Sequence, residues 1–136
     1  MHRTLFRIIA VIFGILSGSA LADNLSKADE YLCAPIQVMA CKSNGDCNQG
    51  LPSSFNIPQF IVVDLKKKEL RTTEASVENR RTPLKHIQRE DGLTVLQGYE
   101  MGRAFSFVIN EETGVASVAV SRDGTTVSVF GACTPA

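Results

Sequence analysis

Residues 104–130 decide the fold, and they read AFSFVINEETGVASVAVSRDGTTVSVF. Apolar side chains take every second position in three short runs, the first at Phe105, Phe107 and Ile109. This period of two is typical of strands that bury one face. Turn-forming residues separate the runs, Glu112-Thr-Gly114 after the first and Asp123-Gly124 after the second. The stretch therefore predicts three antiparallel strands joined by tight turns.

The residues before this stretch continue the same architecture. Runs at 59–65, 69–73, 83–89 and 93–99 are compatible with strands, and an Asp-Gly pair predicts a hairpin between the last two. The first run is apolar on both faces, as expected for a strand covered on both sides. We expect a mainly-β single domain, an antiparallel meander of six or seven strands over residues 59–136. The pattern leaves open whether this is an open sheet or a small barrel.

The segment 23–58 is expected to belong to the same domain as a short helix and a disulfide-bearing loop. Apolar residues at helical spacing predict one short N-terminal helix over about residues 25–34. Pro35 then disfavours a longer helix. The stretch 42–58 is rich in Ser, Asn, Gly and Pro, which indicates a loop.

The first 22 residues have the parts of an export signal. A basic start is followed by an uncharged apolar run, Ile8 to Leu16, and by the small-x-small site Ala20-Leu-Ala22. The apolar run is too short for a membrane-spanning helix, which needs about 20 residues. We expect residues 1–22 to be a signal peptide cleaved after Ala22. The mature chain is then exported, periplasmic or extracellular, without a membrane span.

All four cysteines lie in the predicted mature chain, and they indicate two disulfides. A zinc site is disfavoured because no two cysteines have the close spacing of metal-binding pairs. A turn-forming Asn-Gly between Cys41 and Cys47 favours a short Cys41–Cys47 loop. Cys33 would then pair with Cys133 and fasten the N-terminal segment to the last strand. The pairing of Cys33 with Cys47 and of Cys41 with Cys133 remains open.

Composition and motifs exclude several classes of function. The chain has 136 residues, with 14 Lys and Arg against 14 Asp and Glu, which argues against a basic nucleic-acid binder. The predicted mature chain holds one histidine, His86, so a site with two imidazoles in one chain is excluded. There is no G-x-S-x-G motif around a nucleophilic serine. We expect no catalytic residue, no metal ion and no cofactor.

Residues 66–89 form a strongly charged stretch. They carry a net charge of +5, whereas the rest of the predicted mature chain carries −7. Such a stretch can attract an anionic partner, although lysines on an edge hairpin also protect against aggregation. A second candidate surface is a turn bracketed by Gly98 and Gly102. The candidate binding residues of the two surfaces are Lys66, Lys67, Arg80, Arg81, Lys85, Arg89, Tyr99 and Arg103.

These observations favour a small exported, disulfide-stabilised, non-catalytic binding module. It would engage a protein or an anionic envelope component through the basic 66–89 region, as a monomer and without nucleic acid. The alternative is a small secreted hydrolase or an enzyme inhibitor that acts through a loop, centred on His86 or on the turn at 99–103. A third hypothesis is a part of a larger assembly, with the apolar strand Phe60–Leu65 as an edge that awaits a partner.

Overall fold

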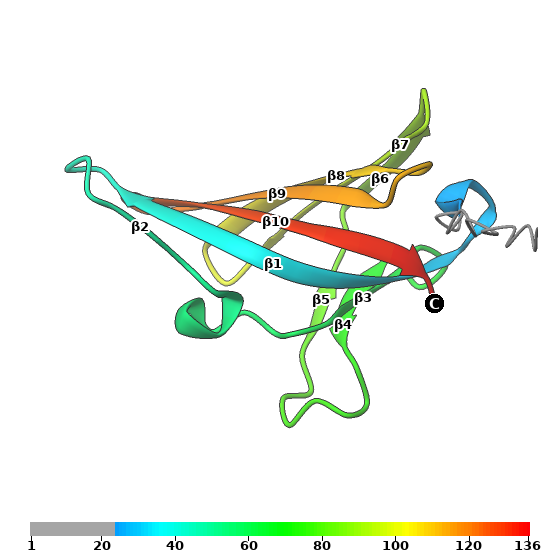
Figure 1. The fold of residues 1–136 in the computed structure, drawn as a ribbon, viewed down its shortest axis with the longest axis horizontal. Coiled ribbons are helices and arrows are strands. Elements are labelled where there is room, and N and C mark those ends of the chain that lie inside the picture. Colours follow the sequence, from blue (N-terminus) through cyan, green and yellow to red (C-terminus); the bar gives the residue numbers. More distant parts are fainter. Residues whose placement is uncertain (1–23) are drawn as a thin grey trace, which may run out of the picture.

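The computed structural model describes residues 24–136 and shows one curled antiparallel sheet, a half-barrel (Figure 1). The predicted signal peptide lies outside the described residues. The strand order is β5-β4-β3-β1-β10-β9-β8-β7-β6, and β2 pairs with part of β1. The described strands are β1 (Glu30–Lys42), β2 (Cys47–Gly50), β3 (Ile61–Asp64), β4 (Glu69–Thr72), β5 (Arg81–Pro83), β6 (His86–Glu90), β7 (Leu93–Glu100), β8 (Arg103–Asn110), β9 (Val115–Arg122) and β10 (Thr125–Pro135).

The prediction of a mainly-β antiparallel domain is confirmed, and β6 to β10 form the expected meander. The hairpin turns follow from local chemistry. Asp91 and Gly92 both have positive φ, as a two-residue turn between β6 and β7 requires. The open, curled sheet decides between the two architectures that the sequence left possible. The described strands number ten, more than the six or seven expected.

The predicted helix over residues 25–34 is wrong. Only a single 3₁₀ turn, η1 (Leu25–Lys27), is present there, and β1 begins at Glu30. The first half of β1 pairs with β10 on one side and with β3 on the other. These two ladders satisfy the backbone over the residues that helical spacing had assigned to the helix, so tertiary pairing overrides a weak local pattern.

The expected loop 42–58 contains β2 and a second 3₁₀ turn, η2 (Pro52–Phe55). The strand β3 is not an edge, because it lies between β1 and β4. Val62 and Val63 are both buried, which confirms that this strand is covered on both faces. The hypothesis of an open Phe60–Leu65 edge is therefore wrong.

The core fills the inside of the curl. Leu25 enters it from η1, and Tyr31, Leu96 and Ile109 enter it from β1, β7 and β8; all four are fully buried. η1 thus plugs one end of the half-barrel. None of the described helices has the length and apolar character needed to cross a membrane.

Both disulfides form with the favoured pairing. Cys33 and Cys133 lie directly opposite each other on β1 and β10, and Cys41 and Cys47 close the β1–β2 hairpin. Cys33 and Cys133 also belong to the buried core. The longer bridge joins residues 100 positions apart and fixes the first described strand to the last.

Candidate functional site

Most of the basic side chains in residues 66–89 are neutralised by acidic neighbours. Six of the eight form ion pairs: Lys66–Asp29, Lys67–Asp64, Arg71–Glu30, Arg80–Glu78, Arg81–Glu69 and Arg89–Glu111. Four of these acids lie outside residues 66–89. The fold therefore brings distant acids onto the basic stretch and cancels much of its charge.

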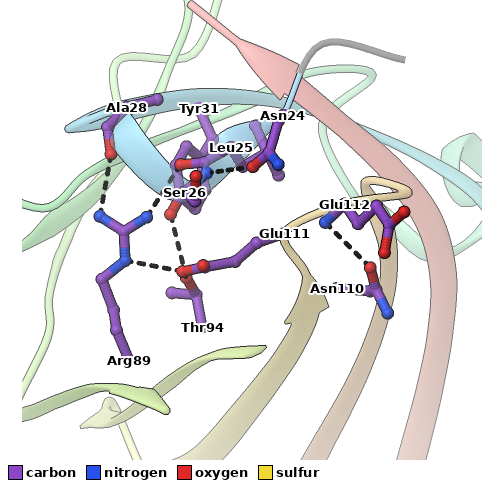
Figure 2. A network of polar contacts seen from close by, with 10 residues as sticks. All are labelled: Asn24, Leu25, Ser26, Ala28, Tyr31, Arg89, Thr94, Asn110, Glu111 and Glu112. Atoms are coloured by element: carbon purple, nitrogen blue, oxygen red, sulfur yellow. Dashed lines mark hydrogen bonds and ion pairs between the residues drawn. The ribbon is translucent and has the colours of Figure 1, made fainter. Parts of the chain in front are cut away.

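Arg89 is held by three groups at the end of the half-barrel (Figure 2). Its Nε donates to Oε1 of Glu111 at 2.7 Å, and its two terminal nitrogens donate to the carbonyl oxygens of Leu25 at 2.8 Å and of Ala28 at 3.2 Å. The backbone N–H of Leu25 donates to the carbonyl of Glu111. The contacts of Arg89 thus secure η1 to the sheet, which is a structural task.

The same network continues into the core through two hydroxyl groups. Thr94 donates to Oε1 of Glu111 at 2.8 Å, and its oxygen accepts a hydrogen bond from the Tyr31 hydroxyl at 2.9 Å. Burial alone would raise the pKa of Glu111, but the hydrogen bonds from Arg89 and Thr94 and the charge of Arg89 outweigh it and lower that pKa. Burial raises the pKa of Tyr31, so its hydroxyl keeps the proton that it donates.

The turn between β3 and β4 carries Lys66, Lys67 and Lys68. The hydrogen bond from Lys66 to Asp29, at 2.9 Å, and the charge of that carboxylate raise the pKa of the lysine. Asp64 caps the turn by accepting the backbone N–H of Lys67 at 2.8 Å. Lys68 has a φ of 55°, which turns the chain into β4.

The two basic side chains of the stretch without an ion pair in the described part of the chain are Lys68 and Lys85. Both line a hollow of about 240 Å³, together with Leu84, His86 and Ile87. Both lysines and His86 are exposed. This hollow is the candidate functional site, and we name it the cationic hollow.

The backbone fixes the position of the cationic hollow. The N–H of Leu84 donates to the carbonyl of Lys68 at 2.8 Å, and the N–H of Lys85 donates to the carbonyl of Gln97 at 2.9 Å. Leu84 and Lys85 connect β5 to β6, the strands at the two ends of the sheet order. The hollow therefore lies where the chain crosses the open side of the curled sheet.

His86 lies at the start of β6 and contacts a neighbouring side chain on the same strand. Its Nε2 lies 3.3 Å from Oε1 of Gln88, its one side-chain hydrogen bond among the described residues. The described part of the chain also holds no group of three His, Cys, Asp or Glu residues placed to bind a metal ion. His86 can offer a ring nitrogen to a ligand in the hollow.

The remaining candidates lie on the β7–β8 hairpin. Its turn is Met101-Gly102, both with positive φ, and it is closed by the pair of Glu100 and Arg103. Tyr99 is 61% exposed on this hairpin. Neither Tyr99 nor Arg103 lines the cationic hollow.

Sequence reasoning selected Lys85 but passed over Lys68 and His86 as binding residues. No known protein family, curated protein or solved structure matches the chain. The candidate site therefore depends on the geometry and the charges of this chain alone.

Proposed function

We propose that this protein is a small exported, non-catalytic binding module that holds an anionic group in the cationic hollow. The observation that supports this most directly is the pattern of ion pairing in the basic residues 66–89. Six of its eight cations have acidic partners, and the two that remain line the same hollow. The predicted signal peptide and the two disulfides support export to an oxidising compartment.

Lys68 and Lys85 have no ion pair among residues 24–136, so their ammonium groups repel each other at the hollow, and an anion between them removes that repulsion. A phosphate or carboxylate group can accept hydrogen bonds from both lysines and from a ring N–H of His86. A hollow of about 240 Å³ is small, so it would hold one charged group of a larger ligand rather than the whole ligand. The ligand we propose is a phosphate- or carboxylate-bearing component of the cell envelope.

The test compares two double variants with the same change in net charge. Lys68→Glu/Lys85→Glu reverses the two cations of the hollow, and Lys42→Glu/Arg122→Glu reverses two exposed cations elsewhere that have no ion pair among the described residues. Protein exported from the full-length gene is purified, and its binding to phosphatidylglycerol vesicles and to inorganic phosphate is measured. The two probes separate a lipid headgroup from a free anion.

We expect wild type and the Lys42/Arg122 variant to bind equally, and the Lys68/Lys85 variant to lose binding. Binding should also weaken between about 50 and 500 mM NaCl, because exposed charges are screened. Equal binding by both variants would refute the role of the hollow. The absence of binding by wild type to either probe and to envelope extract would refute the proposed function.

A further inference from the structure

The convex side of the sheet carries no charge over the residues that pair β8, β9, β10 and β1 with one another, and Glu30, at the start of β1, lies at the border of this surface. The outward residues are the even-numbered ones of β8 and β10, the odd-numbered ones of β9, and the residues of β1 that pair with those of β10. The residues at the alternate positions of these strands, such as Phe107, Ala116 and Cys133, belong to the core. Charged residues make up 21% of the chain, yet none occurs among these outward residues. We name this surface the neutral face.

Phe130 stands near the middle of the neutral face and is 50% exposed. Its cross-strand partners are Ser117 on β9 and Gln37 on β1, and its neighbours two residues away on the same strand are Ser128 and Ala132. The ring therefore has small side chains beside it on β9 and β10, and a longer one only on β1. Val108, which pairs with Ser117 on its other side, adds a second exposed apolar group.

The shape of the neutral face around Phe130 is complementary to itself. If two copies meet about a two-fold axis, the ring of Phe130 in each copy can rest on the small side chains around Ser117 in the other. Neither copy then buries an unpaired charge, whereas a charged partner would lose hydration against a surface that offers it no counter-ion. The neutral face is therefore better suited to pack against a second uncharged face than against a charged partner.

The size of the neutral face sets an upper limit on the area that a dimer can bury. Four strands at about 4.8 Å spacing and about nine residues at 3.3 Å each give roughly 550 Å² per copy. Because the face is convex, two copies touch over only part of it and bury less than the roughly 1,100 Å² of the two faces together, which is the size of a weak or transient interface. Figure 1 shows β9, β10 and β1 side by side as long strands, so this face is continuous across them.

We propose that the neutral face is the interface of a homodimer, in which two copies pack these sheets face to face. The sequence had suggested a monomer, because the exposed apolar residues of this face alternate with core residues and are not recognisable until the strands are paired. The proposal is independent of the cationic hollow, which lies on the β5–β6 connection.

The test is analytical ultracentrifugation of the exported protein from about 1 µM to 1 mM, a range that covers weak to moderate affinities. Phe130→Asp places a charge in the middle of the face, and Ser117→Arg fills the opposing patch of small side chains. Met101→Asp is the matched control, since Met101 is 84% exposed in the β7–β8 turn. Circular dichroism and the two disulfides report whether each variant has folded.

We expect wild type and Met101→Asp to dimerise alike, and Phe130→Asp and Ser117→Arg each to weaken the dimer at least about tenfold, as loss of a central aromatic contact does. Dimerisation should not weaken between about 50 and 500 mM NaCl, because the face is uncharged. A wild-type monomer at every concentration would overturn the proposal, and so would a dimer that both folded variants retain. A monomer that binds another protein through Phe130 would assign the face to that partner and also overturn self-association.

Discussion

Replacing Arg89 by Ala tests whether this arginine is part of the fold or of a binding surface. The substitution removes the ion pair with Glu111 and the two hydrogen bonds to the carbonyl oxygens of Leu25 and Ala28. Glu111 stays behind, 8% exposed, with Thr94 as its remaining side-chain partner. The end of the half-barrel loses the side chain that secures η1 to the sheet.

The loss of stability in Arg89→Ala depends on how deeply the Arg89–Glu111 ion pair is buried. Removing one partner of a fully buried ion pair costs about 3–5 kcal/mol, because a charge is left without compensation. The Arg89 side chain is itself 30% exposed, so water replaces part of what Glu111 loses. We therefore expect a loss of about 2–3 kcal/mol in the free energy of unfolding. For a domain of this size, that lowers Tm by roughly 10 °C.

The pH dependence of the stability of Arg89→Ala gives an independent check of the role of Arg89. In wild type the folded-state pKa of Glu111 is lowered from its usual 4.5, so the carboxylate stabilises the fold above that pH. This contribution is lost as the pH falls through the lowered pKa. Without Arg89, the burial of Glu111 acts with less opposition and raises its pKa, so the carboxylate destabilises the variant at neutral pH. The difference in stability between Arg89→Ala and wild type should shrink from pH 7 towards about pH 3.

The assay is urea denaturation at several pH values, with Arg122→Ala as the control. Arg122 is exposed and forms no ion pair among the described residues, so its variant should stay within about 0.5 kcal/mol of wild type. In the Arg89→Ala background, Glu111→Gln should cost less than in wild type, by about 1–2 kcal/mol. Equal stability of Arg89→Ala and Arg122→Ala at pH 7 would refute the structural role of Arg89.

Two further predictions concern the elements that close the sheet. Replacing Cys33 and Cys133 together by Ala should lower the free energy of unfolding by about 4–5 kcal/mol, and replacing Cys41 and Cys47 should lower it by about 2 kcal/mol. The difference arises because closing the longer loop removes more entropy from the unfolded chain. Urea titration measures both losses, and equal losses would contradict this chain-entropy argument. Leu25→Ala should cost about 3 kcal/mol, since its side chain is fully buried in the core, and a Tm within 2 °C of wild type would show that η1 is not a plug.

Local patterns predicted the parts of the fold that local chemistry determines. The alternation in residues 104–130 and the Gly-containing turns are short-range signals, and β8, β9 and β10 follow them closely. The short Cys41–Cys47 loop was favoured for the same reason. The beginning of β1 was mistaken for a helix because its partners, β10 and β3, are far away in the sequence.

The candidate site was predictable only in part, because ion pairing depends on distant residues. The charge of residues 66–89 is visible in the sequence, but the partners of Arg71 and Arg89 lie 41 and 22 positions away. Nothing in the basic run distinguishes Lys85 from Arg89. The fold distinguishes them, because it brings Glu111 to Arg89 and leaves Lys85 at the surface.

The fold therefore divides the cations of residues 66–89 between two environments: six are paired and support the sheet, and Lys68 and Lys85, without an ion pair among the described residues, lie at the cationic hollow. This separation explains why the net charge of a sequence segment is a poor guide to a binding surface, since distant acids can pair with most of its cations. The two proposals also have opposite responses to salt. Screening weakens an anion held by Lys68 and Lys85, whereas it leaves contacts around Phe130 intact. A single salt titration that follows both anion binding and dimerisation therefore tests each proposal separately.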